Sequence, residues 1–307
     1  MNAPSFELRR HPDTVALLAR CRFPEASTLR CAVSGGPDSM ALLALAVATG
    51  ARVEAHHVNH HLRTDADADI GVIRRFADSH GVVVVEHHVS VSTGPNLEAR
   101  ARAARYGALP DDALTGHTAD DQAETMLINL MRGAGASGLS SMQHARRPLI
   151  GLHRSDTHAL CRTLAIDVVS DSMNDDPRFQ RTRVRSELVP LLNDIAKRDV
   201  VPILVRQSGI LADDERLLDG LASTIDPTDA RSLRDAPLPL ARRALRAWLA
   251  DPYPPDVATI ERVLSVARGD ATACDIGGGR SIRRSQQRLR LIIGSDADPG
   301  SDTKTVV

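Results

Sequence analysis

The chain has 307 residues, of which 42% are apolar, and its 38 Lys and Arg nearly balance its 39 Asp and Glu, for a formal net charge of −1. A chain of this length and composition can bury one large core and a second, smaller one, so two domains are expected. The near-zero net charge argues against polyanion binding over the whole surface, and any nucleic-acid contact has to be a local basic patch.

The four cysteines, Cys21, Cys31, Cys161 and Cys274, are scattered without any C-x-x-C spacing. This disfavours a zinc site, an iron–sulfur cluster and a disulfide framework, and a reducing compartment fits best. No apolar stretch approaches the length of a membrane span, and the N-terminus lacks the pattern of a signal peptide. We therefore expect a cytoplasmic protein that makes no membrane contact.

Short apolar runs alternate with segments of helical period over the first part of the chain. The apolar runs are residues 29–33, 53–58, 82–89, 113–114 and 148–150. The alternation predicts βαβ units, and hence an α/β fold with a parallel twisted sheet and helices on both faces. Ligands of such sheets bind beyond the carboxyl ends of the strands, where residues 34–39, 56–63 and 116–121 are expected to meet.

Residues 34–39, Ser-Gly-Gly-Pro-Asp-Ser, form a glycine turn between the first predicted strand and a predicted helix. Adjacent glycines allow backbone angles that a side chain would forbid, so consecutive amides can converge on a phosphate, and Ser34 and Ser39 add hydroxyl donors. The N-terminus of the following helix is the positive end of its dipole, which also attracts phosphate. A Walker-type loop would end in lysine, but the chain has only Lys197 and Lys304, so this is a different phosphate loop. The alternative is an ordinary glycine turn that caps a helix.

Residues 58–63 follow the second predicted strand and, together with His56 and His57, suggest a metal site at first sight. Neighbouring residues of a strand point to opposite faces, so His56 and His57 cannot both face one ion, and no acid triplet stands nearby. We therefore expect a loop that packs against the base of a nucleotide.

A second strong helical pattern covers residues 96–106, with Asn96 as its cap and with Arg102 and Arg105 three residues apart on one face. Such a pair could neutralise the phosphates of ATP, and an arginine there would offset the charge that grows as pyrophosphate leaves. The alternative is an exposed helix with ordinary surface arginines.

His117 precedes a helical segment for which Thr118 is the expected cap. If the helical turn extends back to His117, then His117, Asp121 and Glu124 stack on one face and form a surface that can hold a cation. In the alternative, Asp120 and Asp121 only complement the helix dipole and Glu124 is solvated. The spacing alone leaves both interpretations open.

Arginines cluster again further along the chain, at Arg178, Arg181, Arg183 and Arg185. This cluster can bind a phosphodiester backbone, and the alternative is a set of ion pairs within the chain. The acidic residues expected for those pairs are Asp171, Asp175 and Asp176.

Strand patterns stop after Pro190 and helical patterns cover residues 200–223, 239–250 and 257–267. A short hairpin of residues 275–283 and 288–292 follows, with no acidic residue between Ile276 and Gly294. The hairpin arginines are Arg280, Arg283, Arg284, Arg288 and Arg290. An RNA contact is favoured on this basic face.

Taken together, the motifs resemble those of tRNA(Ile)-lysidine synthetases, a family of PP-loop ATP pyrophosphatases, over about residues 29–192. The likeness rests on Ser34-Gly35-Gly36-Pro37-Asp38-Ser39, His57-Val58-Asn59-His60, residues 96–106, residues 116–125 and Arg132-Gly133-Ala134-Gly135. The resemblance implies that ATP adenylates the C2 oxygen of the wobble cytidine in a CAU-anticodon isoleucine tRNA. The ε-amine of lysine then displaces AMP, and decoding changes from methionine to isoleucine.

The resemblance also implies a role for each site residue. Catalysis would involve Asp38, Arg105 and His117, and Asp38 would help to hold Mg²⁺ beside the pyrophosphate. Lysine would bind Asp121 and Glu124, which would place and deprotonate its amine. ATP would bind Ser34, Gly35, Gly36, Pro37, Asp38, Ser39 and His117. Apart from the resemblance, the two basic clusters predict that the tRNA binds Arg178, Arg181, Arg183, Arg185, Arg283 and Arg284.

We accordingly expect a PP-loop ATP-binding catalytic domain at residues 1–198, a smaller, mostly helical tRNA-binding domain at 199–295 and a flexible tail at 296–307, in a monomer or homodimer. Three other functions share the nucleotide loop. A tRNA thiolase usually needs paired cysteines, which the chain lacks. A small-molecule amide synthetase would not need the basic hairpin, and a noncatalytic nucleotide-binding module would release no pyrophosphate.

Overall fold

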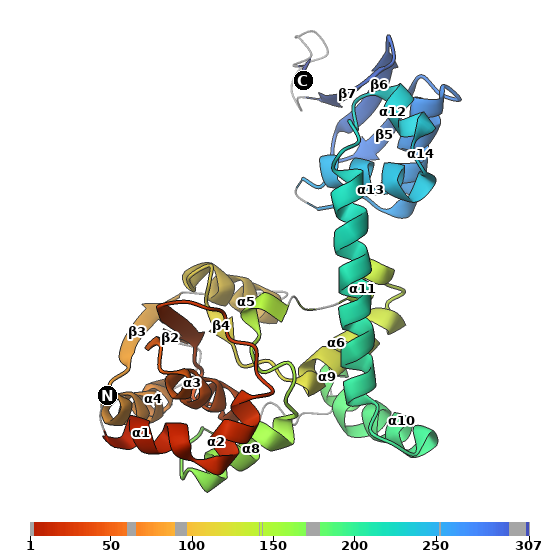
Figure 1. Cartoon of the computed structure of the whole chain (residues 1–307). Helices are drawn as coiled ribbons and strands as arrows, with labels where there is room; N and C mark the ends of the chain where they lie inside the picture. Colours follow the sequence, from red (N-terminus) through yellow and green to blue (C-terminus); the bar gives the residue numbers. More distant parts are fainter. Residues whose placement is uncertain are drawn as a thin grey trace. The chain divides into compact units, whose positions relative to one another are not determined.

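The computed structural model describes residues 3–59, 66–89, 97–140, 142, 144–169, 179–251, 253–294 and 305–306. The chain divides into two compact units, Met1–Ala212 and Asp213–Val307 (Figure 1). The division falls within the long helix α11 (Val201–Ala222). None of the described helices combines the length and apolar character needed to cross a membrane.

The first unit is built on a parallel four-stranded sheet with the strand order β3-β2-β1-β4. Its strands are β1 (Thr28–Ala32), β2 (Arg52–Asn59), β3 (Val83–His88) and β4 (Leu114–Thr115). Four of the five apolar runs therefore form the predicted strands, and the α/β fold class is confirmed. The carboxyl ends of β1 and β4 are neighbours, because Ala32 lies opposite Thr115 in the register.

Helices connect the strands and flank the sheet (Figure 1). The helices of the first unit before α11 are α1 (Ala3–Arg10), α2 (Pro12–Leu18), α3 (Pro37–Thr49), α4 (Ala66–His80), α5 (Leu97–Ala108), α6 (Ala119–Met131), α7 (Ala136–Leu139), α8 (Arg154–Thr163), α9 (Gln180–Arg183) and α10 (Val189–Ala196). A 3-10 turn covers His144–Arg146, and a π-helical segment, Val184–Leu188, joins α9 to α10.

Helix α3 forms the centre of this unit's core. It is apolar on all sides and buried from Ser39 to Ala48, as expected of a helix that is enclosed on every face. The strands β1 and β2 contact it, and so do the helices α1, α2 and α8. Pro37 starts the helix with its ring-fixed φ, and Gly50 ends it in the left-handed region at φ +85°. The first turn of α3 is thereby held rigidly beyond the end of β1.

The fifth apolar run, residues 148–150, is not a strand, so that prediction was wrong. The segment forms turns, in which the Ile150 N–H donates to Arg147 O at 3.3 Å and the Leu152 N–H to Leu149 O at 2.9 Å. Leu149 and Ile150 are buried all the same. The apolar character therefore reflects burial in the core, and backbone hydrogen bonds are satisfied locally instead of in the sheet.

The second unit packs helices against an antiparallel sheet. The helices are α12 (Ala230–Asp235), α13 (Leu238–Trp248) and α14 (Val257–Arg268), and the strands, in spatial order, are β5 (Ala273–Gly277), β6 (Arg280–Ser285), β7 (Arg288–Ile293) and β8 (Thr305–Val306). Leu245, Val263 and Ile282 are fully buried in its core. The predicted helices and the predicted terminal hairpin are confirmed.

Gly116, directly after β4, touches the backbone of the first turn of α3. A Cβ atom at this position would lie 2.7 Å from the carbonyl oxygen of Asp38 and 2.9 Å from its carbonyl carbon. Non-bonded atoms do not approach so closely without moving the backbone. Glycine is therefore what allows the end of β4 to lie against α3.

We predict that Gly116→Ala destabilises the first unit by about 1–3 kcal/mol, because the added methyl overpacks a backbone contact that cannot yield. Gly107→Ala is the matched control, since the space around Gly107 on α5 is open and alanine is the better helix former. Urea denaturation of both variants checks this. Equal midpoints for Gly116→Ala and the unmodified protein would contradict the prediction.

Candidate functional site

The turn between β1 and α3 is closed by its own serines. The Ser34 N–H donates to the Oγ of Ser39 at 3.1 Å, and that hydroxyl donates to the Gly36 carbonyl at 2.8 Å. From outside the turn, the Val169 N–H donates to the carbonyl of Gly35 at 2.9 Å. The turn is thus pre-shaped by hydrogen bonds and ends in the positive N-terminus of α3.

The two glycines of the turn play different parts. Gly35 has φ +86°, in the left-handed region that favours glycine. Gly36 has φ −71°, and a Cβ there would meet nothing closer than the Ser34 Oγ at 3.7 Å. Only Gly35 therefore uses the backbone freedom that the pair of glycines allows. The missing side chain of Gly36 leaves open space above the backbone, which suits a closely approaching ligand.

Asp38 lies in the first turn of α3, where its carboxylate accepts a short hydrogen bond from the hydroxyl of Thr157 on α8. The Nε of Arg154 is 3.6 Å from Asp38 Oδ2. Burial raises the pKa of Asp38 above its usual range, although the Thr157 hydroxyl and Arg154 work in the opposite direction. A cation at this carboxylate would relieve that cost of burial.

Helix α6 begins at Ala119, so His117 lies before the helix and does not stack on it. Thr118 caps α6 as predicted, and its N–H and hydroxyl both donate to Asp121 Oδ2, at 2.9 and 3.0 Å, which makes Asp121 a partner of the capping residue. Nδ1 of His117 is 2.8 Å from the hydroxyl of Thr115 at the end of β4. His117 is therefore held by the end of β4, and it lies close enough to Asp121 to help lower the pKa of that carboxyl.

Glu124 is buried, with 1% of its surface exposed, which excludes the interpretation that it is solvated. Its Oε1 accepts from Arg154 Nη1 at 3.1 Å and from Arg185 Nε at 2.8 Å. Its Oε2 accepts from Arg181 Nε at 2.7 Å. A fully buried carboxylate is stable only with such partners.

Asp121 shares two of these arginines. Its Oδ1 accepts from Arg154 Nη2 at 2.9 Å and from Arg181 Nη2 at 3.1 Å. Burial alone would raise the pKa values of Asp121 and Glu124, but the neighbouring guanidinium groups outweigh it and hold both below their usual range. Both side chains therefore carry a negative charge at neutral pH.

Arg154, at the start of α8, connects the two parts of the site. It contacts Asp38 on one side and the pair Asp121 and Glu124 on the other. Burial would lower the pKa of Arg154, but the three carboxylates raise it above its usual value, so the guanidinium stays charged. We call these six residues, Asp38, Asp121, Glu124, Arg154, Arg181 and Arg185, the charge cluster.

Sequence reasoning missed Arg154 and Thr157. Thr157 is 119 residues from its partner Asp38, and no local spacing relates the two. The local pattern around His153 and Asp156 marks only the start of a helix, in which Asp156 accepts from the His153 N–H at 2.9 Å. Folding of α8 against α3 is what brings these residues to the site.

The predicted tRNA-binding arginines lie in different surroundings. Arg181 and Arg185 belong to the charge cluster, and Arg183 is exposed and pairs with Glu187 at 2.8 Å. In β6, Arg283 is exposed opposite Arg290 of β7, whereas Arg284 is partly buried and donates to Gln287 Oε1 at 2.7 Å. Arg178 lies outside the described residues. So do Asp171, Asp175 and Asp176, the acidic partners that the sequence offered for the arginines of residues 178–185.

The remaining predicted residues include the histidines His56 and His57 of β2 and Arg105 of α5. His56 lies 2.9 Å from His87 of β3 through Nδ1, while Nδ1 of His57 lies 2.9 Å from the carbonyl oxygen of Val33. They do face different neighbours, as strand geometry requires. Arg105 is exposed on α5, and His60, His61 and Asn96 lie outside the described residues.

No group of three or more His, Cys, Asp or Glu side chains within the described residues is arranged to hold a metal ion. Magnesium does not require such a group, since it commonly takes one or two carboxylates together with substrate phosphates and water. The Asp38 carboxylate, next to the open backbone of Gly36, fits that donor set. All four cysteines are free thiols, and burial raises the pKa values of Cys31 and Cys161 to about 12.

Comparisons with known proteins cover both units. The PP-loop domain family matches residues 13–192, and the TilS substrate binding domain matches residues 229–290. A tRNA(Ile)-lysidine synthase of Nocardia farcinica is 36% identical over 89% of this chain and 93% of its own length. The enzyme of the same name from Rhodococcus erythropolis is 36% identical over 92% of this chain and 97% of its own length.

A third relative, the tRNA(Ile)-lysidine synthase of Mycolicibacterium paratuberculosis, is 40% identical over 71% of this chain and 73% of its own length. Identity at this level over most of both chains means a shared fold and ancestry. Together with the PP-loop between β1 and α3, these matches establish that the chain belongs to the tRNA(Ile)-lysidine synthase family.

Proposed function

We propose that this protein is an ATP-dependent ligase that joins lysine to C2 of the wobble cytidine in the CAU anticodon of an isoleucine tRNA. The observation that carries the proposal is that Arg154 touches both Asp38 of the PP-loop and the buried pair Asp121 and Glu124. A nucleotide at the loop and a cationic amine at the pair would then lie within the reach of one arginine side chain. A cytoplasmic location is part of this proposal.

The turn of residues 34–39 is the proposed site of the ATP phosphates. Amides at the N-terminus of α3 and the Ser34 hydroxyl would donate to phosphate oxygens, and the Ser39 hydroxyl would do so by leaving the Gly36 carbonyl. The open space above Gly36 would let the phosphates approach. Asp38 would hold Mg²⁺, which when bound neutralises charge that grows on the departing pyrophosphate. Arg105 and His117 are proposed to stabilise the activated phosphate and cytidine.

Asp121 and Glu124 are the proposed site of the ammonium groups of lysine. Their low pKa values keep both carboxylates charged at neutral pH, as binding of an ammonium group requires. An incoming lysine has to replace contacts now made by Arg181 or Arg185, whose side chains remain about one third exposed, at 35% and 34%. Arg154 is more enclosed, at 18%, and would stay in place.

The proposed reaction has two steps. The C2 oxygen of cytidine attacks the α-phosphorus of ATP, a new P–O bond forms, and the bond to the β-phosphate breaks to release pyrophosphate. The ε-amine of lysine then attacks C2, a C–N bond forms, and the C2–O bond breaks to release AMP. The amine must lose a proton, and the carboxylate of Asp121 or Glu124 is the proposed acceptor.

The tRNA is proposed to contact exposed arginines in both units. Arg283 and Arg290 lie directly opposite each other on the exposed face of β6 and β7, and such like-charge pairs are unfavourable unless an anion such as RNA phosphate lies between them. Arg183 is a further candidate. The thiolase alternative is disfavoured, because buried cysteines with pKa values of about 12 are poor sulfur nucleophiles.

A single assay tests the proposed function. We expect the protein, incubated with ATP, Mg²⁺, radiolabelled lysine and a CAU-anticodon isoleucine tRNA, to transfer label into RNA with one pyrophosphate released per lysine. A transcript with a different wobble base is the control and should accept no label. Incorporation that ignores the wobble base, or ATP binding without pyrophosphate release, would reject the proposal.

We predict that Gly36→Ala weakens ATP binding by about tenfold or more without changing stability. The methyl group fits the ligand-free turn, but it blocks phosphate from amides that form charge-assisted hydrogen bonds. Titration calorimetry with ATP and urea denaturation measure the two quantities. Gly35→Ala is the comparison, and it should lose about 1–2 kcal/mol of stability because of its positive φ. Unchanged ATP affinity in Gly36→Ala would place the phosphates elsewhere.

We further predict that Asp121→Asn raises the KM for lysine by about tenfold or more, because the charge is lost. Asparagine keeps an oxygen that can accept from the Thr118 N–H, so the start of α6 should remain capped. Asp120→Asn, one residue away, is the control and should leave the KM for lysine near its normal value. A KM for lysine that is unaltered in Asp121→Asn would remove this residue from the lysine site.

A further inference from the structure

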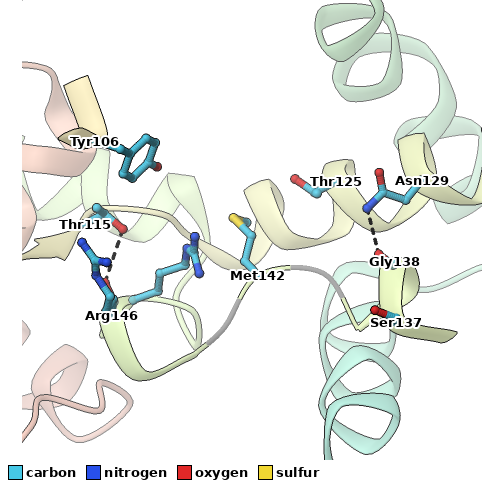
Figure 2. A pocket seen from close by; sticks show the side chains of 9 residues that line it. Tyr106, Thr115, Thr125, Asn129, Ser137, Gly138, Met142 and Arg146 are labelled. Carbon is cyan, nitrogen blue, oxygen red and sulfur yellow. Dashed lines mark hydrogen bonds between the residues drawn. The ribbon is translucent and has the colours of Figure 1, made fainter. Parts of the chain in front are cut away.

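A cavity of about 360 Å³ lies beside the charge cluster in the first unit, and no step of the reaction described above uses it. Figure 2 shows side chains from several elements around it, among them Tyr106, Thr115, Thr125, Asn129, Met142 and Arg146. The volume falls within the range of small-ligand sites, at its lower end.

The cavity adjoins both proposed substrate sites. Thr115 lines it, and the next residue, Gly116, lies against the backbone of Asp38 in the PP-loop. On α6, Thr125 and Asn129 follow Asp121 at four-residue intervals, so the three lie along one side of the helix. A ligand in the cavity would therefore lie beside the PP-loop and one helical turn from the proposed lysine carboxylates.

The lining suits a neutral heterocycle better than a cation. The described residues that line the cavity include two arginines, Arg146 and Arg147, but no carboxylate. The Arg146 guanidinium is held by the carbonyls of Ala113 and Pro110, at 3.2 and 3.4 Å. These carbonyls are neutral and leave its positive charge uncompensated. Lysine would be repelled here, whereas a nucleotide would offer a phosphate to the arginines and a base to the ring of Tyr106.

Asn129 gives the cavity a defined hydrogen-bond direction. Its Nδ2 donates to the carbonyl oxygen of Gly138 at 2.8 Å (Figure 2), and because a carbonyl can only accept, this contact fixes the amide orientation. Its Oδ1 is left as an acceptor, and within the described residues nothing donates to it. Cytidine presents an exocyclic amine on its pairing edge, where uridine presents a carbonyl oxygen.

We infer that this cavity binds the target cytidine after it has left the base stack, with the ring beside Tyr106 and its exocyclic amine donating to Oδ1 of Asn129. The inference rests on the proposed function and identifies where its nucleobase is read. Asn129 is then a specificity-determining residue, because uridine would set one oxygen acceptor against another.

The test measures binding, separately from turnover. Filter binding without ATP or lysine gives the dissociation constants of two tRNA transcripts that differ only in cytidine or uridine at the wobble position. The unmodified protein is expected to prefer cytidine, and Asn129→Ala to lower that preference by about tenfold. Leu130→Ala, on the same helix and 57% exposed, is the control and should keep the preference.

A second pair of variants covers the case in which Asn129→Ala disturbs the Gly138 contact. Tyr106→Phe keeps the ring and should bind the cytidine transcript normally, whereas Tyr106→Ala should bind it about tenfold more weakly. An unchanged preference in Asn129→Ala, or an equal loss of affinity for both transcripts, overturns the inference. If the unmodified protein forms lysidine but Asn129→Ala keeps the full preference for cytidine, only this inference fails. If the unmodified protein forms no lysidine, the proposed function fails.

Discussion

The guanidinium of Arg154 lies between carboxylates from two distant helices, Asp38 of α3 and the pair Asp121 and Glu124 of α6. Without it, three acidic side chains would meet in a largely buried space with less compensation, and at least one of them would have to take up a proton. Arg181 and Arg185 complete the neutralisation from the segment around α9. Because Arg154 contacts both groups, the position of α8, which begins with Arg154, helps to set the distance between the PP-loop and the α6 carboxylates.

The parallel sheet provides the frame for this arrangement. The carboxyl ends of β1 and β4 are adjacent, so the PP-loop after β1 and the His117 segment after β4 meet at one edge. Because Gly116 has no side chain, the backbone after β4 can lie in direct contact with the first turn of α3. The contact between β4 and α3 therefore brings α6, with its carboxylates and its cavity side, next to the turn that follows β1.

Three surfaces of different chemistry adjoin at this edge. Backbone amides and hydroxyls surround the open space at Gly36, charged carboxylates lie at Asp121 and Glu124, and the cavity at Asn129 is lined by hydroxyl, amide and aromatic groups with two arginines. In the proposed reaction, anionic phosphate, cationic amine and neutral base would each match one of them. A ligase with three substrates needs such a separation, since each site then disfavours the other two ligands.

Local sequence patterns determined the strands, the PP-loop and the capped start of α6, because backbone hydrogen bonding and side-chain period are decided by neighbours in the chain. They failed at residues 148–150, where apolar residues are buried in a turn. They did place the turn between β6 and β7, although Gln286 and Gln287, which form it with positive φ, are not residues that favour such angles. Only the tertiary structure decided that Glu124 is buried, that Arg181 and Arg185 neutralise it, and that Thr157 bonds to Asp38. The distance between two paired side chains depends on how their helices pack, and the number of residues between them in the chain does not determine it.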